Sequence, residues 1–221
     1  MLTLKLKFSA SPLRFLLEAA QALNIPLPPH APLLFEMYFR TLCAWNAKTN
    51  LTTIVDGKGV YLKHFIDSLL PERFIPHHAH VVDIGSGAGF PGIPLAIVRS
   101  DLKVTLVDAS LKKIYFQRHV IRTLKIAGTV ALHERAENII LPHNGDIVFI
   151  SRAFSNLARF LSIVSGLKGP RDIVIAMKGP TVKKELELVA PHLAGWKMSI
   201  KHVEMFSLPF THHKRAVVIF E

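Results

Sequence analysis

The 221-residue chain contains a single cysteine, Cys43, which excludes an intramolecular disulfide framework. It lacks any run of roughly 18 to 20 uncharged apolar residues, the length that a membrane-spanning helix requires. Its most apolar stretch, 81–98, is interrupted by Asp83 and by several glycines. The opening residues show no apolar segment followed by a small-residue cleavage site, so we expect no secretory signal. Together these absences favour a protein without membrane spans in the reducing cytoplasm.

Charge is sparse but strongly one-sided. Charged residues make up 19% of the chain, hydrophobic residues 50%, and the mean hydropathy is +0.32, which excludes an intrinsically disordered chain. The 27 basic residues exceed the 16 acidic ones, giving a net charge of +11 and an isoelectric point near 10.0. The excess is largest toward the C-terminus. It suits a polyanionic partner, although a soluble protein from a basic proteome is an equal alternative.

The first seventy residues show helical spacing. Apolar residues recur at intervals of three and four over 13–23 and 33–45, and a third helical pattern covers 61–70 after a turn at Gly57 and Gly59. No strand pattern is evident there. We therefore expect an N-terminal helical segment over 1–71 and one larger unit over 72–221.

Beyond Pro71 the pattern alternates between strands and helices. Short β-branched runs at 80–84, 104–107, 129–132, 147–150 and 173–177 are separated mostly by helical patterns at 92–99, 111–126, 155–167 and 181–190. Such alternation predicts a parallel sheet with right-handed crossovers. The last two extended runs, 197–205 and 215–220, have no helix between them and predict a terminal antiparallel hairpin. The fold class is therefore α/β, with a seven-stranded, mostly parallel sheet.

The segment 81–94 is the most informative part of the sequence. A buried strand runs directly into a loop with glycines at 85, 87, 89 and 92, and the loop opens a helix. Glycines let the backbone approach a ligand closely, and the first turn of the helix offers unpaired amides. A purely structural turn does not need four glycines in eight positions, so a ligand-binding loop is favoured.

Two cofactor classes fit this loop. Residues 87–92 spell G-x-G-x-x-G, and Asp108 follows about 20 residues on, as in NAD-binding folds. Asp83, however, stands two residues before Gly85. A carboxylate there would repel a pyrophosphate but can help to hold the cationic S-adenosylmethionine, directly or through water. Asp108 would accept hydrogen bonds from ribose hydroxyls in either case, or cap the next helix instead.

Five separated motifs carry a family resemblance. They are WNAKTNLT (45–52), HFIDSL (64–69), DIGSGAGFPGIPLAIV (83–98), SRAF (151–154) and MKG (177–179). In this order, over nearly the whole chain, they resemble the ribosomal small-subunit methyltransferase G family, also called glucose-inhibited division protein B. The Phe-Pro-Gly-Ile-Pro that ends the glycine loop is the most specific of these matches.

The resemblance implies a class I SAM-dependent methyltransferase with a Rossmann-like fold. Its cofactor would be S-adenosyl-L-methionine, and its substrate N7 of guanosine 527 in the 530 loop of 16S rRNA of the small ribosomal subunit. By this analogy Gly85 and Phe90 line the cofactor pocket, and Gly87 and Gly89 shape it. Further cofactor contacts, at the adenine ring and after the fourth strand, fall on Ala136, Glu137 and Arg152.

No catalytic residue in the strict sense is expected. Guanine N7 carries an in-plane lone pair and no proton, so attack on a sulfonium methyl group needs alignment rather than a general base. The sequence lacks the D/N-P-P-Y/F/W motif of amine methyltransferases. Cys43 lies in a predicted N-terminal helix, which argues against the cysteine-dependent chemistry of pyrimidine C5. The scattered histidines lack ligand partners, so no metal is assigned.

Arg152 and Lys178 follow the fourth and fifth predicted strands, at the edge where open α/β folds bind ligands. Arg152 suits guanine O6, a phosphate or the cofactor, and Lys178 suits an rRNA phosphate. The alternatives are an ion pair of Arg152 with Asp146 or Glu137, and a solvated Lys178.

Other polar residues are weaker candidates. Arg135, Lys214 and Arg215 are possible RNA contacts, and a buried ion pair is an alternative for Arg215. His64 and Asp67 lie one helical turn apart, which allows a local hydrogen bond or a cap over the cofactor site. Trp45, Asn46 and Asn50 are typical of core, cap and turn positions at the end of a helix.

The sequence thus favours a cytoplasmic, monomeric, SAM-dependent methyltransferase of 16S rRNA. Two other classes stay open: an NAD-dependent oxidoreductase, because of the literal G-x-G-x-x-G, and a non-catalytic ribosome-assembly factor that binds rRNA through its basic surface.

Overall fold

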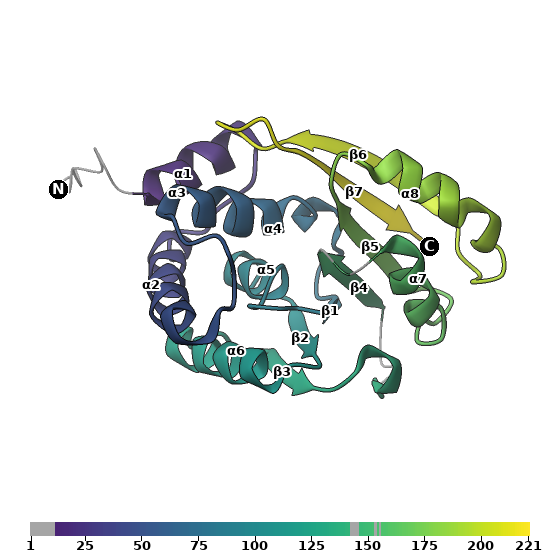
Figure 1. The fold of residues 1–221 in the computed structure, drawn as a ribbon, viewed down its shortest axis with the longest axis horizontal. Helices are drawn as coiled ribbons and strands as arrows, with labels where there is room; N and C mark the ends of the chain where they lie inside the picture. Colours follow the sequence, from purple (N-terminus) through teal and green to yellow (C-terminus); the bar gives the residue numbers. More distant parts are fainter. Residues whose placement is uncertain (1–11, 142–145, 153, 155) are drawn as a thin grey trace, which may run out of the picture.

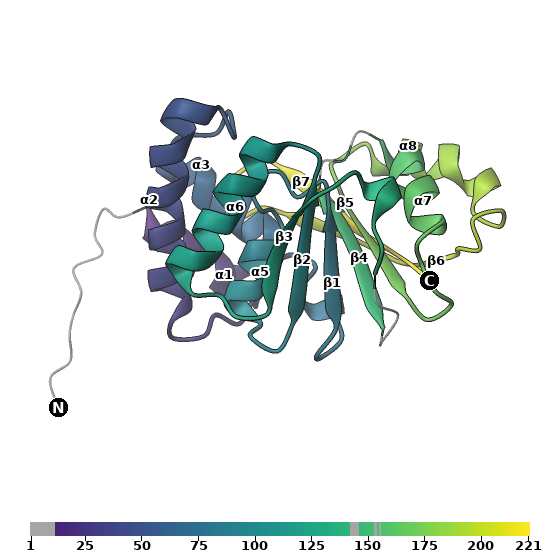
Figure 2. The same cartoon turned by 90° about the horizontal axis from the view of Figure 1, so that it is seen from below.

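A computed structural model describes residues 12–141, 146–152, 154 and 156–221 of the chain. Its centre is a seven-stranded sheet in the order β3-β2-β1-β4-β5-β7-β6, with helices on both faces (Figures 1 and 2). The strands span His80–Ile84 (β1), Lys103–Asp108 (β2), Thr129–His133 (β3), Ile147–Arg152 (β4), Ile173–Lys178 (β5), Ile200–Ser207 (β6) and Lys214–Phe220 (β7).

The pairing of the strands confirms the predicted α/β architecture. Strands β1 to β5 pair with one another in parallel, whereas β7 runs antiparallel to both β5 and β6. The terminal hairpin therefore attaches to the sheet through its second strand. The predicted start of this hairpin at residue 197 is too early, because residues 190–198 form a short helical turn and a loop before β6 begins.

The helices after β1 lie close to their predicted positions. They are α5 (Gly92–Val98), α6 (Leu111–Leu124), α7 (Leu157–Ser165) and α8 (Val182–Val189). Helix α7 begins at Leu157 because the side chain of Asn156 accepts a hydrogen bond from the Arg159 amide, at 2.7 Å, and caps the helix. Residue 155, its predicted start, lies outside the described residues.

The N-terminal part is helical, as predicted, but its third helix starts earlier than expected. It contains α1 (Leu13–Ala22), α2 (Ala31–Thr49), α3 (Gly57–Val60), the π-helical segment η1 (Tyr61–Ile66) and α4 (Asp67–Leu69). The residues expected to form a glycine turn begin α3 instead. The reason is that Asp56 caps them, with its carboxylate accepting from the Gly59 amide at 2.6 Å.

Two hydrophobic clusters lie on the two faces of the sheet. Residues of β1 alternate between them: Val81 belongs to the cluster covered by α1 to α6, and Val82 to the cluster covered by α7 and α8. The first cluster also contains buried residues of the N-terminal helices, such as Leu16 and Phe35. The N-terminal segment and the sheet therefore share one core, and the boundary near residue 71 stays a prediction.

The order of the strands creates a site for ligands. Strand β1 lies between β2 and β4: the chain continues from β1 to β2 and β3 on one side, and then crosses back to β4 on the other side. The carboxyl ends of β1 and β4 thus form the switch point at which open α/β folds bind ligands. In the described part of the chain, no helix is both long and apolar enough to cross a membrane.

Candidate active site at the carboxyl edge of the sheet

The glycine loop leaves β1 with a backbone that favours glycine. Gly85, Gly87 and Gly89 have φ angles of +70°, +62° and +90°. A Cβ atom on Gly85 would lie 2.9 Å from the ring of Phe154, whereas one on Gly87 would meet only the Gly85 carbonyl oxygen, at 3.9 Å. Phe154 therefore packs against the loop at Gly85, whereas the space beside Gly87 is open to a ligand.

Neighbouring elements hold the loop in place. The amides of Gly85 and Ser86 both donate to the carbonyl oxygen of Val107 in β2, at 2.9 and 3.0 Å. From α6, the buried Gln117 donates to the Ser86 hydroxyl at 2.8 Å and to the Gly87 carbonyl at 2.7 Å. The sequence reasoning missed Gln117, because nothing local to α6 indicates that its side chain reaches a loop 30 residues away.

Asp108 lies at the end of β2 beside this loop. Its carboxylate accepts from the amides of Gly87 and Ser110, both at 2.9 Å, and forms an ion pair with Lys113 at 3.3 Å. The carboxylate lines a small cavity of about 130 Å³. The carboxylate is therefore already oriented in the position predicted for a ribose contact.

The other wall of this small cavity is formed by the chain after β3. Ala136 and Glu137 begin a short 3-10 turn there and line the cavity together with Gly85 and Arg135. Glu137 forms an exposed ion pair with Arg159 at 3.6 Å. The structure thus brings Gly85, Asp108, Ala136 and Glu137, four of the predicted cofactor contacts, to one cavity.

Asp83 and Phe90 are buried and line neither this cavity nor the larger one described below. Asp83 is fully buried and its Oδ2 accepts from the Gly92 amide at 2.8 Å, while Oδ1 has no hydrogen-bond partner among the described residues. Burial raises the pKa of Asp83 to about 7. Phe90 is only 4% exposed and stacks on His64 with 4.6 Å between ring centres. Side-chain contact of either residue with a cofactor stays a prediction.

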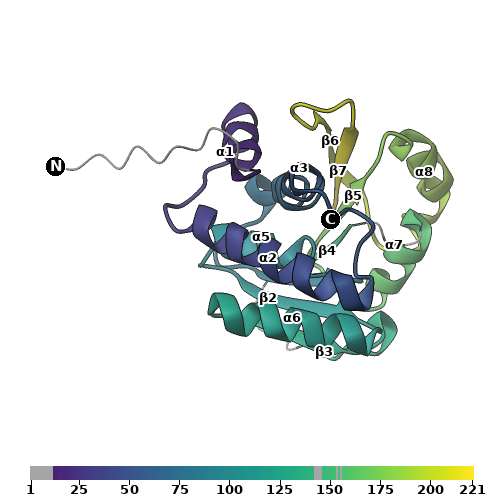
Figure 3. The ribbon, with the colours of Figure 1, turned by 60° about the vertical axis from the view of Figure 1, so that its left-hand side comes forward.

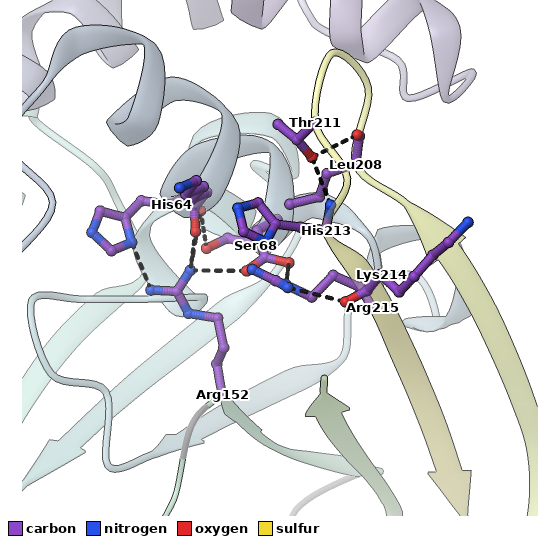
Figure 4. A network of polar contacts seen from close by, with 10 residues as sticks. His64, Ser68, Arg152, Leu208, Thr211, His213, Lys214 and Arg215 are labelled. Carbon is purple, nitrogen blue, oxygen red and sulfur yellow. Dashed lines mark hydrogen bonds and ion pairs between the residues drawn. The ribbon is translucent and has the colours of Figure 1, made fainter. Parts of the chain in front are cut away.

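Arg152 ends β4 and reaches across to the N-terminal helices (Figure 4). Its guanidinium donates to the Lys63 carbonyl at 3.0 Å, contacts His64 Nδ1 at 3.1 Å and lies 3.5 Å from Asp67 Oδ2. The expected alternatives were ion pairs with Asp146 or Glu137. Neither forms, because Asp146 pairs with Arg171 and Glu137 with Arg159.

Asp67 is shared by two arginines. Its Oδ1 accepts from Arg215 Nε at 2.9 Å and its Oδ2 faces Arg152, so the ion pair considered as the alternative for Arg215 does form. Burial raises the pKa of Asp67, and both guanidinium groups oppose this shift. Two cations thus share one carboxylate, and the local charge is positive.

His64 is held neutral beside this pair. Its Nδ1 faces the Arg152 guanidinium, which has only donors, so Nδ1 accepts and Nε2–H donates to the Thr52 hydroxyl at 2.8 Å. Burial and the charge of Arg152 lower the pKa of His64 to about 3. The local hydrogen bond that the spacing of His64 and Asp67 allows does not form, because both side chains turn toward Arg152. His64 therefore does not act as a proton acceptor here.

These residues line a large cavity of about 680 Å³, next to the glycine loop. The ionisable residues of its lining come from η1 and α4 (Lys63, His64, Asp67), the carboxyl ends of β4 and β5 (Arg152, Lys178), the amino end of β7 (Arg215) and α8 (Glu185). Lys178 is not solvated as considered above, since it pairs with Glu185 at 2.8 Å and is mostly buried. Lys214 bonds to the Ser207 hydroxyl at 2.7 Å and, like the exposed Arg135, lies outside this lining.

Phe154 lines both cavities and separates them. Phe154 belongs to the SRAF motif, but the sequence alone assigned no role to this position. Its place two residues after a strand-end arginine was the available signal. The arrangement places a glycine-loop cavity and a cationic cavity on either side of one aromatic ring.

The sheet order, the glycine loop after β1 and the acid at the end of β2 together define a class I, Rossmann-like SAM-dependent methyltransferase. Among solved structures, a SAM-dependent methyltransferase from Aquifex aeolicus aligns with a TM-score of 0.56 at 19% identity, covering 78% of this chain and 97% of that one. The structure of M. jannaschii TYW2 in complex with AdoMet aligns with a TM-score of 0.55 at 16% identity, covering 71% of this chain and 75% of that one.

The model of the family GidB, rRNA small subunit methyltransferase G, matches residues 33–217, and the chain belongs to this family. A ribosomal RNA small subunit methyltransferase G from Halalkalibacterium halodurans is 40% identical over 84% of this chain and 80% of its own length. A ribosomal RNA small subunit methyltransferase G from Geobacter sp. strain M21 is 35% identical over 97% of this chain and 94% of its own length. The resemblance seen in the sequence is thereby confirmed, and the protein is a methyltransferase, not an NAD-dependent oxidoreductase.

Proposed function

We propose that this protein methylates N7 of guanosine 527 in the 530 loop of 16S rRNA. The observation that carries the proposal is the pair of cavities divided by Phe154 at the switch point of the sheet. One has the features of a nucleoside-binding site, and the other is large and cationic enough for a nucleotide of an RNA chain. A cytoplasmic, monomeric enzyme fits the proposal, because ribosomes are assembled there and one chain supplies both cavities.

The small cavity fits the adenosine part of S-adenosylmethionine. Gly85 and Gly87 leave the loop backbone open, Asp108 offers carboxylate oxygens to ribose hydroxyls, and Ala136 and Glu137 form the wall for the adenine ring. When bound, this cofactor supplies a methyl group on a positively charged sulfonium. The role of the chain is to fix that methyl group beside the cavity of the substrate.

The large cavity supports recognition of an RNA nucleotide. Arg152 and Lys178 lie in its wall, where they suit guanine O6 or a phosphate, and Arg215 extends the same positive region. Because Nδ1 of His64 is occupied by Arg152, the His64 ring is not available as a base. That arrangement suits guanine N7, whose attack releases no proton from the base and needs only alignment.

The test is methyl transfer from labelled S-adenosylmethionine to small subunits that lack the modification, followed by borohydride and aniline, which cleave at 7-methylguanosine. We expect cleavage at one site in the 530 loop. Label at another nucleotide would contradict the proposed substrate, and label without cleavage would contradict N7 as the acceptor. The absence of transfer to a substrate that a known member of the family methylates would contradict the activity itself.

Two glycine variants test the cofactor site, one at Gly85 in the loop and a matched control at Gly166. Gly85→Ala places a methyl group 2.9 Å from the Phe154 ring at a φ of +70°, so we expect binding of S-adenosylhomocysteine to weaken at least tenfold. In Gly166→Ala the new methyl group meets only the Ile163 carbonyl oxygen, at 3.6 Å, so binding should be unchanged. Calorimetry of both variants measures this difference.

A further inference from the structure

Helix α6 carries a basic surface that the proposed site does not use. The sequence has no aspartate or glutamate between Ala109 and His133. Lys112, Tyr115 and Arg122 are all exposed on α6, and their spacing of three and seven residues places them on one face of the helix. This face points away from the sheet, because Ile114, Phe116 and other residues of α6 are buried against the core.

This face forms one side of a groove. Helices α2 and α6 lie side by side (Figure 3), and a cavity of about 340 Å³ lies between them. Its lining consists of Trp45, Thr49, Lys112, Tyr115, His119 and Arg122. Tyr115 is 55% exposed, and Trp45 and His119 pack together with 5.3 Å between ring centres. Aromatic rings and cations thus alternate in one groove.

The cations of the groove have no acidic partners. In the described ranges, no carboxylate lies within ion-pair distance of Lys112 or Arg122. Elsewhere, exposed basic side chains such as Arg40 and Lys201 are paired with glutamates. Lys112 instead donates to the Thr49 carbonyl oxygen, at 3.2 Å, across the groove. The groove is therefore a region of uncompensated positive charge that suits phosphates.

A short loop connects the groove to the large cavity. Asn46, one residue after Trp45, donates to the Thr52 carbonyl and accepts from its amide, both at 2.9 Å. The hydroxyl of Thr52 contacts His64 Nε2 at 2.8 Å, and His64 lines the large cavity. A chain of contacts through Asn46, Thr52 and His64 therefore links the groove to the large cavity.

We propose that the groove between α2 and α6 binds a single-stranded stretch of rRNA next to the target nucleotide. Lys112 and Arg122 would contact phosphates, and the exposed ring of Tyr115 would stack on a base. A single strand is favoured over a duplex because only an unpaired base presents its face to an aromatic side chain. This inference rests on the proposed function, since it takes rRNA as the substrate.

The test compares three variants of the full chain. Lys112→Glu/Arg122→Glu reverses both charges, Tyr115→Ala removes the ring, and Tyr115→Phe keeps it. The matched control, Lys103→Glu/Lys197→Glu, makes the same change of charge at two exposed lysines outside the groove. Affinity for deproteinised 16S rRNA is measured over a range of salt concentrations, and binding of S-adenosylhomocysteine reports on the cofactor site.

We expect the double charge reversal to weaken rRNA binding at least tenfold and to lower the salt dependence by about two phosphate contacts. Tyr115→Ala should weaken binding about five- to twentyfold. Tyr115→Phe and the control should stay within about twofold of the unchanged protein. Binding of S-adenosylhomocysteine should not change in any variant, because the groove lies outside the cofactor site.

Two outcomes would overturn the inference. One is that the charge reversal leaves rRNA binding unchanged, or that the loss of the Tyr115 ring does. The other is weaker binding to small subunits with unchanged binding to deproteinised rRNA, which would assign the groove to a ribosomal protein. Because affinity is measured without methyl transfer, failure of the proposed reaction remains distinguishable from failure of the groove.

Discussion

Asp67 shows how much a single buried residue can decide in this protein. Its carboxylate is 4% exposed and compensates both Arg152 and Arg215, which come from β4 and β7. Without the Asp67 carboxylate, two guanidinium groups would lie close together in a largely buried environment without a counter-charge. A buried charge without its partner costs far more free energy than a lost surface ion pair.

We therefore expect Asp67→Asn to lower the free energy of unfolding by about 3–5 kcal/mol. Glu221→Gln, which breaks an exposed ion pair with Lys201, should change it by less than about 1 kcal/mol. Urea unfolding of both variants measures the contrast. Equal and small effects would contradict the view that Asp67 holds the two arginines.

Two other buried groups give the stability opposite pH dependences. The pKa of Asp83, about 7 in the folded protein and 3.8 for the free group, makes the folded state bind more protons between these values, so stability falls as pH rises through this window. The pKa of His64, about 3 against 6.5, makes the unfolded state bind more protons, so stability rises from about pH 3 to 6.5. The two effects partly cancel below pH 6.5.

The variant Asp83→Asn removes only the falling component. Relative to the unchanged protein, its free energy of unfolding should therefore improve progressively between pH 5 and pH 8, by an amount on the order of 2 kcal/mol. Unfolding titrations at several pH values measure this difference. Asp101→Asn is the control, because Arg99 holds the pKa of Asp101 far below this window. A constant difference for Asp83→Asn would contradict the raised pKa.

At the scale of elements, helix α2 shapes the glycine loop as much as the sheet does. The hydroxyl of Tyr38, which is fully buried in α2, donates to the carbonyl oxygen of Ala88 in the middle of the loop. The ring of Tyr38 stacks on Phe90 with 5.5 Å between centres. An N-terminal helix thus positions the loop that follows β1, across 50 residues of sequence.

Replacing Tyr38 by Phe leaves the Ala88 carbonyl without its buried donor. We expect a loss of about 1–3 kcal/mol in the free energy of unfolding and several-fold weaker binding of S-adenosylhomocysteine. Tyr61→Phe removes a comparable bond, from the tyrosine hydroxyl to Glu36 at 2.6 Å, away from the loop. It should lower stability without affecting the cofactor. Equal cofactor binding in both variants would separate α2 from the function of the loop.

At the scale of the molecule, the N-terminal helices and the sheet share one hydrophobic core. Buried residues of α1 and α2, such as Leu16 and Phe35, belong to the same cluster as Val81, Ile93 and Leu106 of the Rossmann-like part. Helix α2 also supplies the loop contact of Tyr38, and η1 and α4 supply the cavity residues His64 and Asp67. Stability and the site therefore depend on both parts of the chain.

We expect the fragment 72–221 not to fold by itself. Removing residues 1–71 would expose the apolar face of the sheet and of α5, and would leave Arg152 and Arg215 without Asp67. Near-ultraviolet circular dichroism and urea unfolding of the fragment and the full chain test this. A cooperative transition of the isolated fragment would show that the boundary near residue 71 separates independent domains.

Much of the fold could be predicted because its signals are local. The strand at 80–84 was predicted with its observed bounds, since a β-branched run ending in a glycine loop is a pattern of adjacent residues. The predicted start of the third helix, at residue 61, is wrong, because the capping hydrogen bond of Asp56 outweighs the turn preference of two glycines. The network around Arg152 could not be predicted in the same way, because Asp67 lies 85 residues away.

The sequence by itself determined the alternation of strands and helices, the glycine loop, the class of cofactor and the family, because each depends on neighbouring residues or on motifs in a fixed order. Only the tertiary structure decided which side chains share a cavity. Packing brought Asp67 between Arg152 and Arg215, keeps His64 neutral, and buries Asp83 and Phe90 outside the cavity linings. Burial and charge at these positions come from residues distant in the chain, so no local pattern records them.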